Sequence, residues 1–144
     1  MPSMPQDNLV QHLREAFPDL EDRYQERVKF WKGERAPSSY GVLGAVLRPA
    51  LDQDLKKGHL TEFVRRAALF IEEICDSHDR EAVNVVWIGI FEWLIFNPKE
   101  LHLFWPVLGQ ETKANLKDAA RRWSEAGRRF GKTKGLPEEF LPEE

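Results

Sequence analysis

Residues 80–96, REAVNVVWIGIFEWLIF, decide the fold that the sequence predicts. After the first turns, almost every position from Val85 to Phe96 is apolar. A helix that is hydrophobic on all sides is normally buried on all sides. Asn84 and Glu92 interrupt the run, which is also shorter than the roughly 20 residues that a membrane-spanning helix needs. The stretch therefore predicts a buried central helix and no membrane segment.

Amphipathic patterns on both sides of this stretch predict further helices. Pro49 lies inside one of them and predicts a kink or a break near Leu47–Arg48, because a proline ring clashes with the carbonyl four residues back. The last long helix is expected to bury Leu116, Trp123 and Phe130. No segment alternates polar and apolar residues in the manner of a strand. The amphipathic segments are residues 7–17, 19–31, 40–57, 60–75 and 110–130.

The predicted fold class is therefore all-α, with about six helices. The helical pair that begins at Tyr40 and the pair that begins near Asp79 are 39 residues apart, close to the roughly 40–47-residue period of HEAT and armadillo hairpins. We therefore expect antiparallel helical hairpins in a HEAT- or armadillo-like stack, with helix 80–96 buried at the centre. Residues 1–130 are expected to form a single domain, and residues 131–144 a partly ordered acidic tail.

Composition excludes several other classes of protein. A chain of 144 residues has the size of one domain. Its net charge of −3 disfavours nucleic-acid binding driven by whole-molecule charge. Cys75 is the single cysteine, so no internal disulfide can form, and this suits a reducing cytoplasm. The N-terminus has neither the basic nor the apolar region of a secretory signal, so we expect a cytoplasmic protein.

Residues 75–79, CDSHD, carry side chains that bind metals or take part in catalysis in other proteins. A closed zinc site needs four ligands, but Cys75 lies on the apolar face of its predicted helix. Its acidic neighbours, including Glu72 and Asp76, raise the pKa of the thiol, and His78 offsets this only with favourable geometry. The chain has no glycine-rich phosphate loop and no hydrolase or metalloprotease motif. We predict no catalytic, cofactor-binding or metal-binding residue, and no enzyme.

Acidic side chains cluster near one predicted helix connection. Carboxylates presented to a basic cleft give fast, salt-sensitive association, although the same residues also favour helix N-termini and solubility. Leu69 falls on the polar side of its helix, where it is either a lone exposed leucine or an interface anchor. Glu92 must be paired, protonated or at an edge of the core. The candidate partner-binding residues are Glu72, Glu73, Asp76, Asp79, Glu81 and Leu69.

Basic residues gather in the last predicted helix. Residues 111–134 carry a net charge of +5, whereas residues 1–110 carry −4. At three- and four-residue spacing, several of these cations line one helical face that can contact phosphates or an acidic partner. Alternatively, they pair with the acidic body or with the glutamates of the tail. The alternative binding residues are Arg121, Arg122, Arg128 and Arg129.

Three segments carry sequence patterns of a known family. They are YGVLGAVLRPAL at Tyr40–Leu51, FVRRAALFIEEICDSHDREAVNVV at Phe63–Val86, and PVLGQETKANL at Pro106–Leu116. On these segments the chain resembles small all-helical bacterial proteins of unassigned activity, which are often encoded beside polymorphic toxins and are suspected immunity proteins. The family supplies no catalytic residues.

The resemblance implies an immunity protein that neutralises a cognate bacterial toxin domain by stoichiometric binding and occlusion of its active site. We expect it to act as a monomer and not to bind nucleic acid. The alternative is a helical-repeat adaptor that binds a protein or a nucleic acid through the basic last helix.

Overall fold

The computed structural model describes residues 6–30 and 38–143. Within these ranges the structure contains no strand, and its seven helices confirm the all-α class. None of the helices in the described part of the chain combines the length and the apolar composition that crossing a bilayer requires. The elements are α1 (Gln6–Ala16), a 3-10 turn (Pro18–Leu20), α2 (Glu21–Phe30), α3 (Ser39–Val42), η2 (Leu43–Leu47), α4 (Arg48–Leu55), α5 (Glu62–Asp76), α6 (Arg80–Val86), η3 (Trp87–Phe91), α7 (Glu92–Ile95), α8 (Pro98–Phe104), η4 (Trp105–Val107), α9 (Gln110–Arg129) and η5 (Pro137–Phe140).

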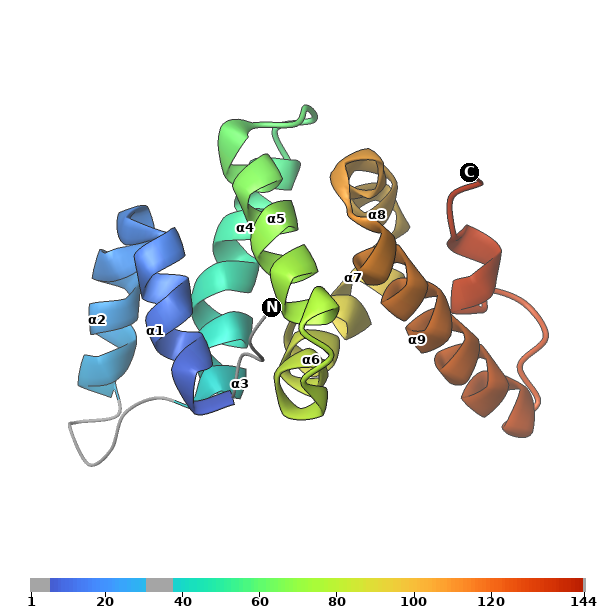
Figure 1. The fold of residues 1–144 in the computed structure, drawn as a ribbon. Coiled ribbons are helices and arrows are strands. Elements are labelled where there is room, and N and C mark those ends of the chain that lie inside the picture. The colour runs from blue at the N-terminus through green and yellow to red at the C-terminus, as the bar shows by residue number, and fades with distance from the viewer. Residues whose placement is uncertain (1–5, 31–37, 144) are drawn as a thin grey trace.

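Two of the seven helices are continuous through a wide turn. The elements η2 and η3 are π turns, in which an N–H bonds to the carbonyl five residues back. We call α3, η2 and α4 together helix 39–55, and α6, η3 and α7 together helix 80–95. The helices follow one another in a row, from α1 and α2 at one end to α9 and the C-terminal segment at the other (Figure 1).

Local sequence signals determine where two of these helices begin. Thr61 is the N-cap of α5, and its hydroxyl oxygen accepts a hydrogen bond from the Val64 N–H at 3.2 Å. Asp79 is the N-cap of α6. A capping side chain accepts hydrogen bonds from backbone N–H groups that have no partner within the helix. Helix 39–55 ends before Gly58, whose positive φ of 83° favours a residue without a side chain.

Pro49 does not break helix 39–55, contrary to the stronger form of the prediction. The disturbance is instead the wide turn Leu43–Leu47, which lies directly before the proline. There the Arg48 N–H bonds to the Leu43 carbonyl, five residues back. Pro49 has no N–H to contribute, and a wider turn relieves the clash of its ring with the preceding carbonyl. The helix therefore continues to Leu55.

The two wide turns pack against each other. Gly89 in η3 lies so close to helix 39–55 that a Cβ added there would be 3.1 Å from the Leu43 Cβ. A Cβ added at Gly44, in the facing turn, would have no heavy atom within 4 Å. Of these two glycines, only Gly89 is therefore required to lack a side chain for the two helices to approach so closely.

Helix 80–95 is central but not buried all round, which corrects the prediction. Val85, Val86, Ile90 and Leu94 are fully buried. In contrast, Asn84 is exposed, and the exposed fractions of Ile88 and Phe96 are 46% and 53%. The reason is that α1, α5, α8, α9 and helix 39–55 pack against part of helix 80–95 and leave the stripe that contains Asn84, Ile88 and Phe96 uncovered. The structure does not confirm a HEAT- or armadillo-like stack.

The C-terminal part of the chain also differs from the predicted pattern. Leu116 is buried, but Trp123 is 41% exposed and Phe130 is 91% exposed, so the apolar face of α9 is shorter than expected. The segment after α9 turns back and packs η5 against that helix. Leu136 is buried there, and the Glu138 N–H donates to the hydroxyl of Ser124, a buried residue of α9, at 3.0 Å.

The close crossing predicts opposite effects for two glycine substitutions. Gly89→Ala is expected to lower the free energy of unfolding by about 1–3 kcal/mol, because the added methyl group overpacks the contact with Leu43. Gly44→Ala is the matched control and is expected to be neutral or stabilising by up to about 1 kcal/mol. Urea denaturation followed by tryptophan fluorescence measures both. Equal stabilities of the two variants would contradict the close crossing.

Candidate functional site

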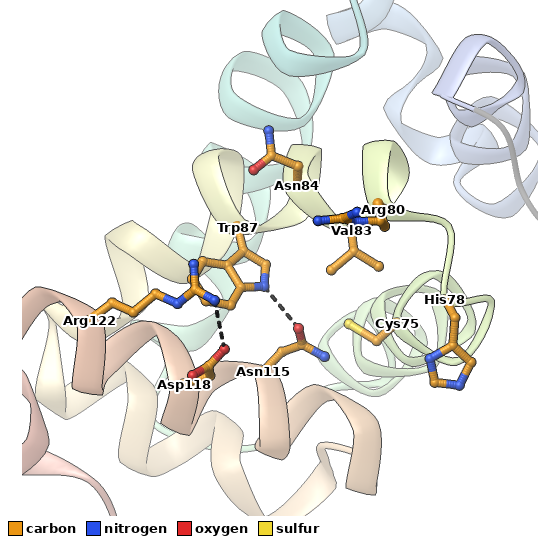
Figure 2. Close-up of a pocket in the computed structure, with 9 residues that line it drawn as sticks. All are labelled: Cys75, His78, Arg80, Val83, Asn84, Trp87, Asn115, Asp118 and Arg122. Carbon is orange, nitrogen blue, oxygen red and sulfur yellow. Dashed lines mark hydrogen bonds and ion pairs between the residues drawn. The ribbon is translucent and has the colours of Figure 1, made fainter.

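A pocket of about 340 Å³ opens between helix 80–95 and α9, beside the indole of Trp87 (Figure 2). Three parts of the chain meet here: the end of α5 with the turn that follows it, the first part of helix 80–95, and the middle of α9. We call this the Trp87 pocket. Its lining residues are Cys75, His78, Arg80, Val83, Asn84, Trp87, Asn115, Asp118 and Arg122.

Hydrogen bonds and stacking hold the indole of Trp87 in place. Its Nε1–H donates to the Asn115 side-chain oxygen at 2.9 Å, and the Asn115 amide nitrogen donates to the Glu111 carbonyl at 2.8 Å. The Arg122 guanidinium lies over the ring, 5.2 Å from its centroid. Guanidinium groups interact favourably with the face of an indole. Contacts within the chain thus fix this wall of the pocket.

The charged groups of the pocket are unequally engaged. Asp118 pairs with Arg121 and also lies 3.5 Å from the Arg122 guanidinium, so two cations share one carboxylate. Arg80 makes no hydrogen bond or ion pair with any residue that the structure describes. Two guanidinium groups therefore reach the pocket with donors to spare.

Exposed apolar side chains also occur on α9 and along helix 80–95 and its C-cap. Phe96 and Trp123 meet edge to face, with ring centroids 5.4 Å apart, and Ile88 lies two turns before Phe96 on helix 80–95. We call Ile88, Phe96 and Trp123 the apolar strip. Trp123 directly follows the pocket residue Arg122, and Ile88 directly follows Trp87, so we treat the strip and the Trp87 pocket together as one candidate surface, which we call the binding face.

Because of the wide turn η3, the exposed residues of helix 80–95 stay on one side of the helix along its length. Asn84, Ile88, Glu92 and Phe96 are four residues apart, and all four reach solvent, Glu92 being half-buried. In an uninterrupted α-helix, each four-residue step drifts by about 40°, because 3.6 residues complete a turn. The wide turn has more residues per turn, so it rotates less per residue and offsets part of this drift. Sequence reasoning missed this stripe, although the polar residues Asn84 and Glu92 mark it within an otherwise apolar run.

Glu72, predicted to bind a partner, instead caps the first turn of α9. Its Oε1 accepts hydrogen bonds from the Thr112 N–H at 2.8 Å and from the Thr112 hydroxyl at 2.7 Å, and its Oε2 accepts one from the Glu111 N–H at 3.2 Å. A Cβ at Gly109, the N-cap of α9, would overlap this carboxylate. Glu72 therefore ties α9 to α5.

Two more of the predicted carboxylates have partners within the chain. The Glu73 Oε2 lies 3.0 Å from the His12 Nε2. The Asp79 Oδ1 accepts hydrogen bonds from the N–H groups of Glu81 and Ala82, both at 3.1 Å, and so caps α6. Neither carboxylate is wholly available to a partner protein.

The remaining members of the predicted set are exposed. Asp76 and Glu81 accept no side-chain hydrogen bond from the described residues, and Leu69 is 68% exposed on α5. Asp76 also lies near His78 and Glu111, and the ligand atoms of these three residues are within 4.8 Å of one another. Two carboxylates and an imidazole suit a divalent cation chemically, but exposed acidic groups often gather in this way without one.

The alternative basic residues do not form one free face. Arg121 pairs with Asp118, and the Arg128 guanidinium lies 3.5 Å from the Glu138 carboxylate of the folded-back segment. Arg129 is exposed near the end of α9. Part of the positive charge of α9 is therefore compensated within the chain.

Cys75 lines the pocket but lacks the features of a nucleophile. The residue is 1% exposed, and burial raises the pKa of its thiol to about 12. The nearby carboxylates of Glu72 and Glu111 raise the pKa further, while a hydrogen bond with Thr112 opposes this. Near neutral pH the side chain is therefore a protonated, apolar group.

The burial of Cys75 predicts that its thiol is unreactive in the folded protein. Near pH 8 the native chain is expected not to react with Ellman's reagent over a period in which the urea-unfolded chain reacts with one equivalent, because the native thiol is protonated and covered. Absorbance of the released thiolate measures both rates. Fast stoichiometric labelling of the native protein would contradict the assignment.

The α9 cap predicts different roles for two adjacent glutamates. Glu72→Ala is expected to lower the free energy of unfolding by about 1–3 kcal/mol, because N–H groups at the start of α9 lose their acceptor. Glu73→Ala, the control, removes an exposed contact with His12 and is expected to cost less than about 1 kcal/mol. Urea denaturation compares them, and an equal loss would contradict the cap.

Comparison with known proteins shows to which family the chain belongs. No curated protein and no solved structure matches the chain. One family model does match, over residues 10–124, and the family is described as a domain of unknown function (DUF7674). The matched range covers α2, helices 39–55 and 80–95, and most of α9, and so contains the whole binding face. The chain belongs to this family, DUF7674.

Proposed function

We propose that the protein is an immunity protein, which neutralises a cognate bacterial toxin by stoichiometric binding and occlusion of the toxin's active site. The resemblance of the segments at Tyr40–Leu51, Phe63–Val86 and Pro106–Leu116 supports the class of partner. The protein acts in the cytoplasm as a monomer and catalyses no reaction. Its binding face is the surface that contacts the toxin.

The observation that carries this proposal is the concentration of side chains on the binding face that are enriched in protein interfaces. Tryptophan, phenylalanine and arginine are over-represented in such interfaces, and tryptophan and arginine among their energetic hot spots. Trp123 and Phe96 are exposed beside each other, and Arg122 lies on Trp87. Contacts within the chain already fix Trp87 and Arg122, so binding costs little side-chain entropy.

The chemistry of the pocket favours binding over catalysis. The thiol of Cys75 is buried with a raised pKa. The side-chain amide of Asn115 is engaged with Trp87 and Glu111, and that of Asn84 donates to the Tyr40 hydroxyl at 2.9 Å. These groups build a wall and leave no activated nucleophile within the pocket.

Two other surfaces remain as weaker proposals. The acidic set keeps Asp76, Glu81 and Leu69 as exposed members, whereas Glu72 is occupied at α9. The adaptor alternative needs a free basic face on α9, and the pairing of Arg128 with Glu138 weighs against it.

Co-purification with the product of the neighbouring gene tests the proposal. The tagged protein is expected to retain that product in a one-to-one complex and to rescue cells that co-express the toxin. The variants Phe96→Ala and Trp123→Ala are each expected to weaken binding by about 10- to 100-fold, as hot-spot truncations do. Titration calorimetry measures the affinities.

Two controls separate the candidate surfaces. Phe130→Ala removes an aromatic side chain that is 91% exposed at the far end of α9, and is expected to leave the affinity unchanged. Leu69→Ala with Asp76→Asn tests the acidic set in the same way. Loss of binding only in this pair would move the contact to that surface, and absence of any rescue would overturn the proposed function.

A further inference from the structure

We infer that the Trp87 pocket receives an acidic side chain of the partner protein, which the guanidinium groups of Arg80 and Arg122 attract (Figure 2). The inference deepens the proposed function, on which it rests for the class of partner. It adds the chemistry of recognition: a carboxylate enters the pocket, and an apolar side chain next to it lies on the apolar strip.

The hydrogen-bonding groups of the pocket show what a ligand must offer. The Trp87 N–H, the Asn115 amide and the Asn84 amide nitrogen already donate within the chain. The charged donors that remain belong to Arg80, which is unpaired among the described residues, and to Arg122, whose carboxylate contact is shared. His78 adds a neutral ring N–H at the other end of the pocket. A ligand that satisfies them must supply acceptors, and arginine pairs best with a planar anionic group such as a carboxylate.

The arrangement of charge directs the anion to one end of the pocket. In Figure 2 the guanidinium end of Arg80 points toward Trp87, on whose ring Arg122 lies. His78 lines the other end, where Asp76 and Glu111 lie near it and repel a second carboxylate. Asp118 also lines the pocket, but its carboxylate is already shared by Arg121 and Arg122. The positive charge that no described carboxylate compensates is that of Arg80, and this charge attracts an acidic side chain to the Trp87 end of the pocket.

A protein carboxylate fits this site better than a nucleic-acid backbone. A phosphodiester chain needs a row of available cations, but Arg121 and Arg128 of α9 are paired with acidic residues. The pocket instead offers the guanidinium groups of Arg80 and Arg122 and, among the described residues that line it, no further arginine or lysine, and the apolar strip offers nothing to phosphates. A volume of about 340 Å³ admits a glutamate or aspartate side chain with bridging water.

Two small probes that differ by one charge test the inference without the toxin. The first is N-acetyl-glutamyl-leucinamide and the second is its neutral twin, N-acetyl-glutaminyl-leucinamide. Each is titrated into the ¹⁵N-labelled full-length protein, and the indole N–H resonance of Trp87 is followed by NMR. The charged probe is expected to shift this resonance and to bind at least about tenfold more tightly than the neutral probe, because charge-assisted hydrogen bonds are lost in the latter.

Substitutions of the two arginines test whether these residues cause the preference for the charged probe. Arg80→Gln changes an exposed side chain without partners, so the fold is kept, and the tenfold preference for the charged probe is expected to fall below about threefold. Arg122→Gln is expected to do the same, and the dispersion of the indole resonances verifies its folding. Arg129→Gln, an exposed arginine near the end of α9, is the control and is expected to keep the preference.

Three results would overturn the inference. They are equal binding of the two probes, an unchanged preference in Arg80→Gln, and tighter binding of inorganic phosphate than of the glutamyl probe. The last would make the pocket a phosphate site. Because no toxin takes part, a positive result stands even if co-purification and rescue fail, and a negative result leaves the proposed toxin contact to be judged by its own experiment.

Discussion

The hydrogen bonds that the Glu72 carboxylate accepts from the first turn of α9 are the constraint on which the binding face depends. The first N–H groups of any helix lack partners within it, and Gly109 at the N-cap of α9 has no side chain to offer. Glu72 supplies the acceptor from α5, and the missing side chain of Gly109 leaves room for it. Because α9 starts there, Asn115 and Arg122 reach Trp87, and Trp123 reaches the end of helix 80–95.

The two wide turns determine how helices 39–55 and 80–95 pack and which side of helix 80–95 is exposed. They let helices 39–55 and 80–95 cross at Gly89, and the turn in helix 39–55 accommodates Pro49 without a break. The turn in helix 80–95 aligns its open stripe from Asn84 to Phe96. Wide turns of this kind recur at functional sites in other proteins, and here one of them contains Trp87 at the edge of the pocket.

On this surface, the groups available to a partner are those that contacts within the chain do not already use. The side chains that could have been flexible, Trp87 and Asn115, are held by hydrogen bonds within the chain. What remains for a partner is apolar area on the strip and hydrogen-bond donors on Arg80 and Arg122. Prior ordering lowers the entropic cost of association, and this suits the binding role that we propose.

The sequence by itself determined the helical class and the position of most helices, because four-residue apolar periodicity and turn residues act locally. It also pointed to the protonated state of Cys75 through the acidic neighbours of that residue, whereas in the structure burial is the larger cause of the raised pKa. It did not determine the role of Glu72, whose partners lie about 40 residues further along the chain. Nor did it reveal that Trp123 and Phe96 are exposed, since an apolar pattern is the same whether another helix covers it or not. Only the tertiary structure decided which sides were covered, because coverage depends on where distant helices pack.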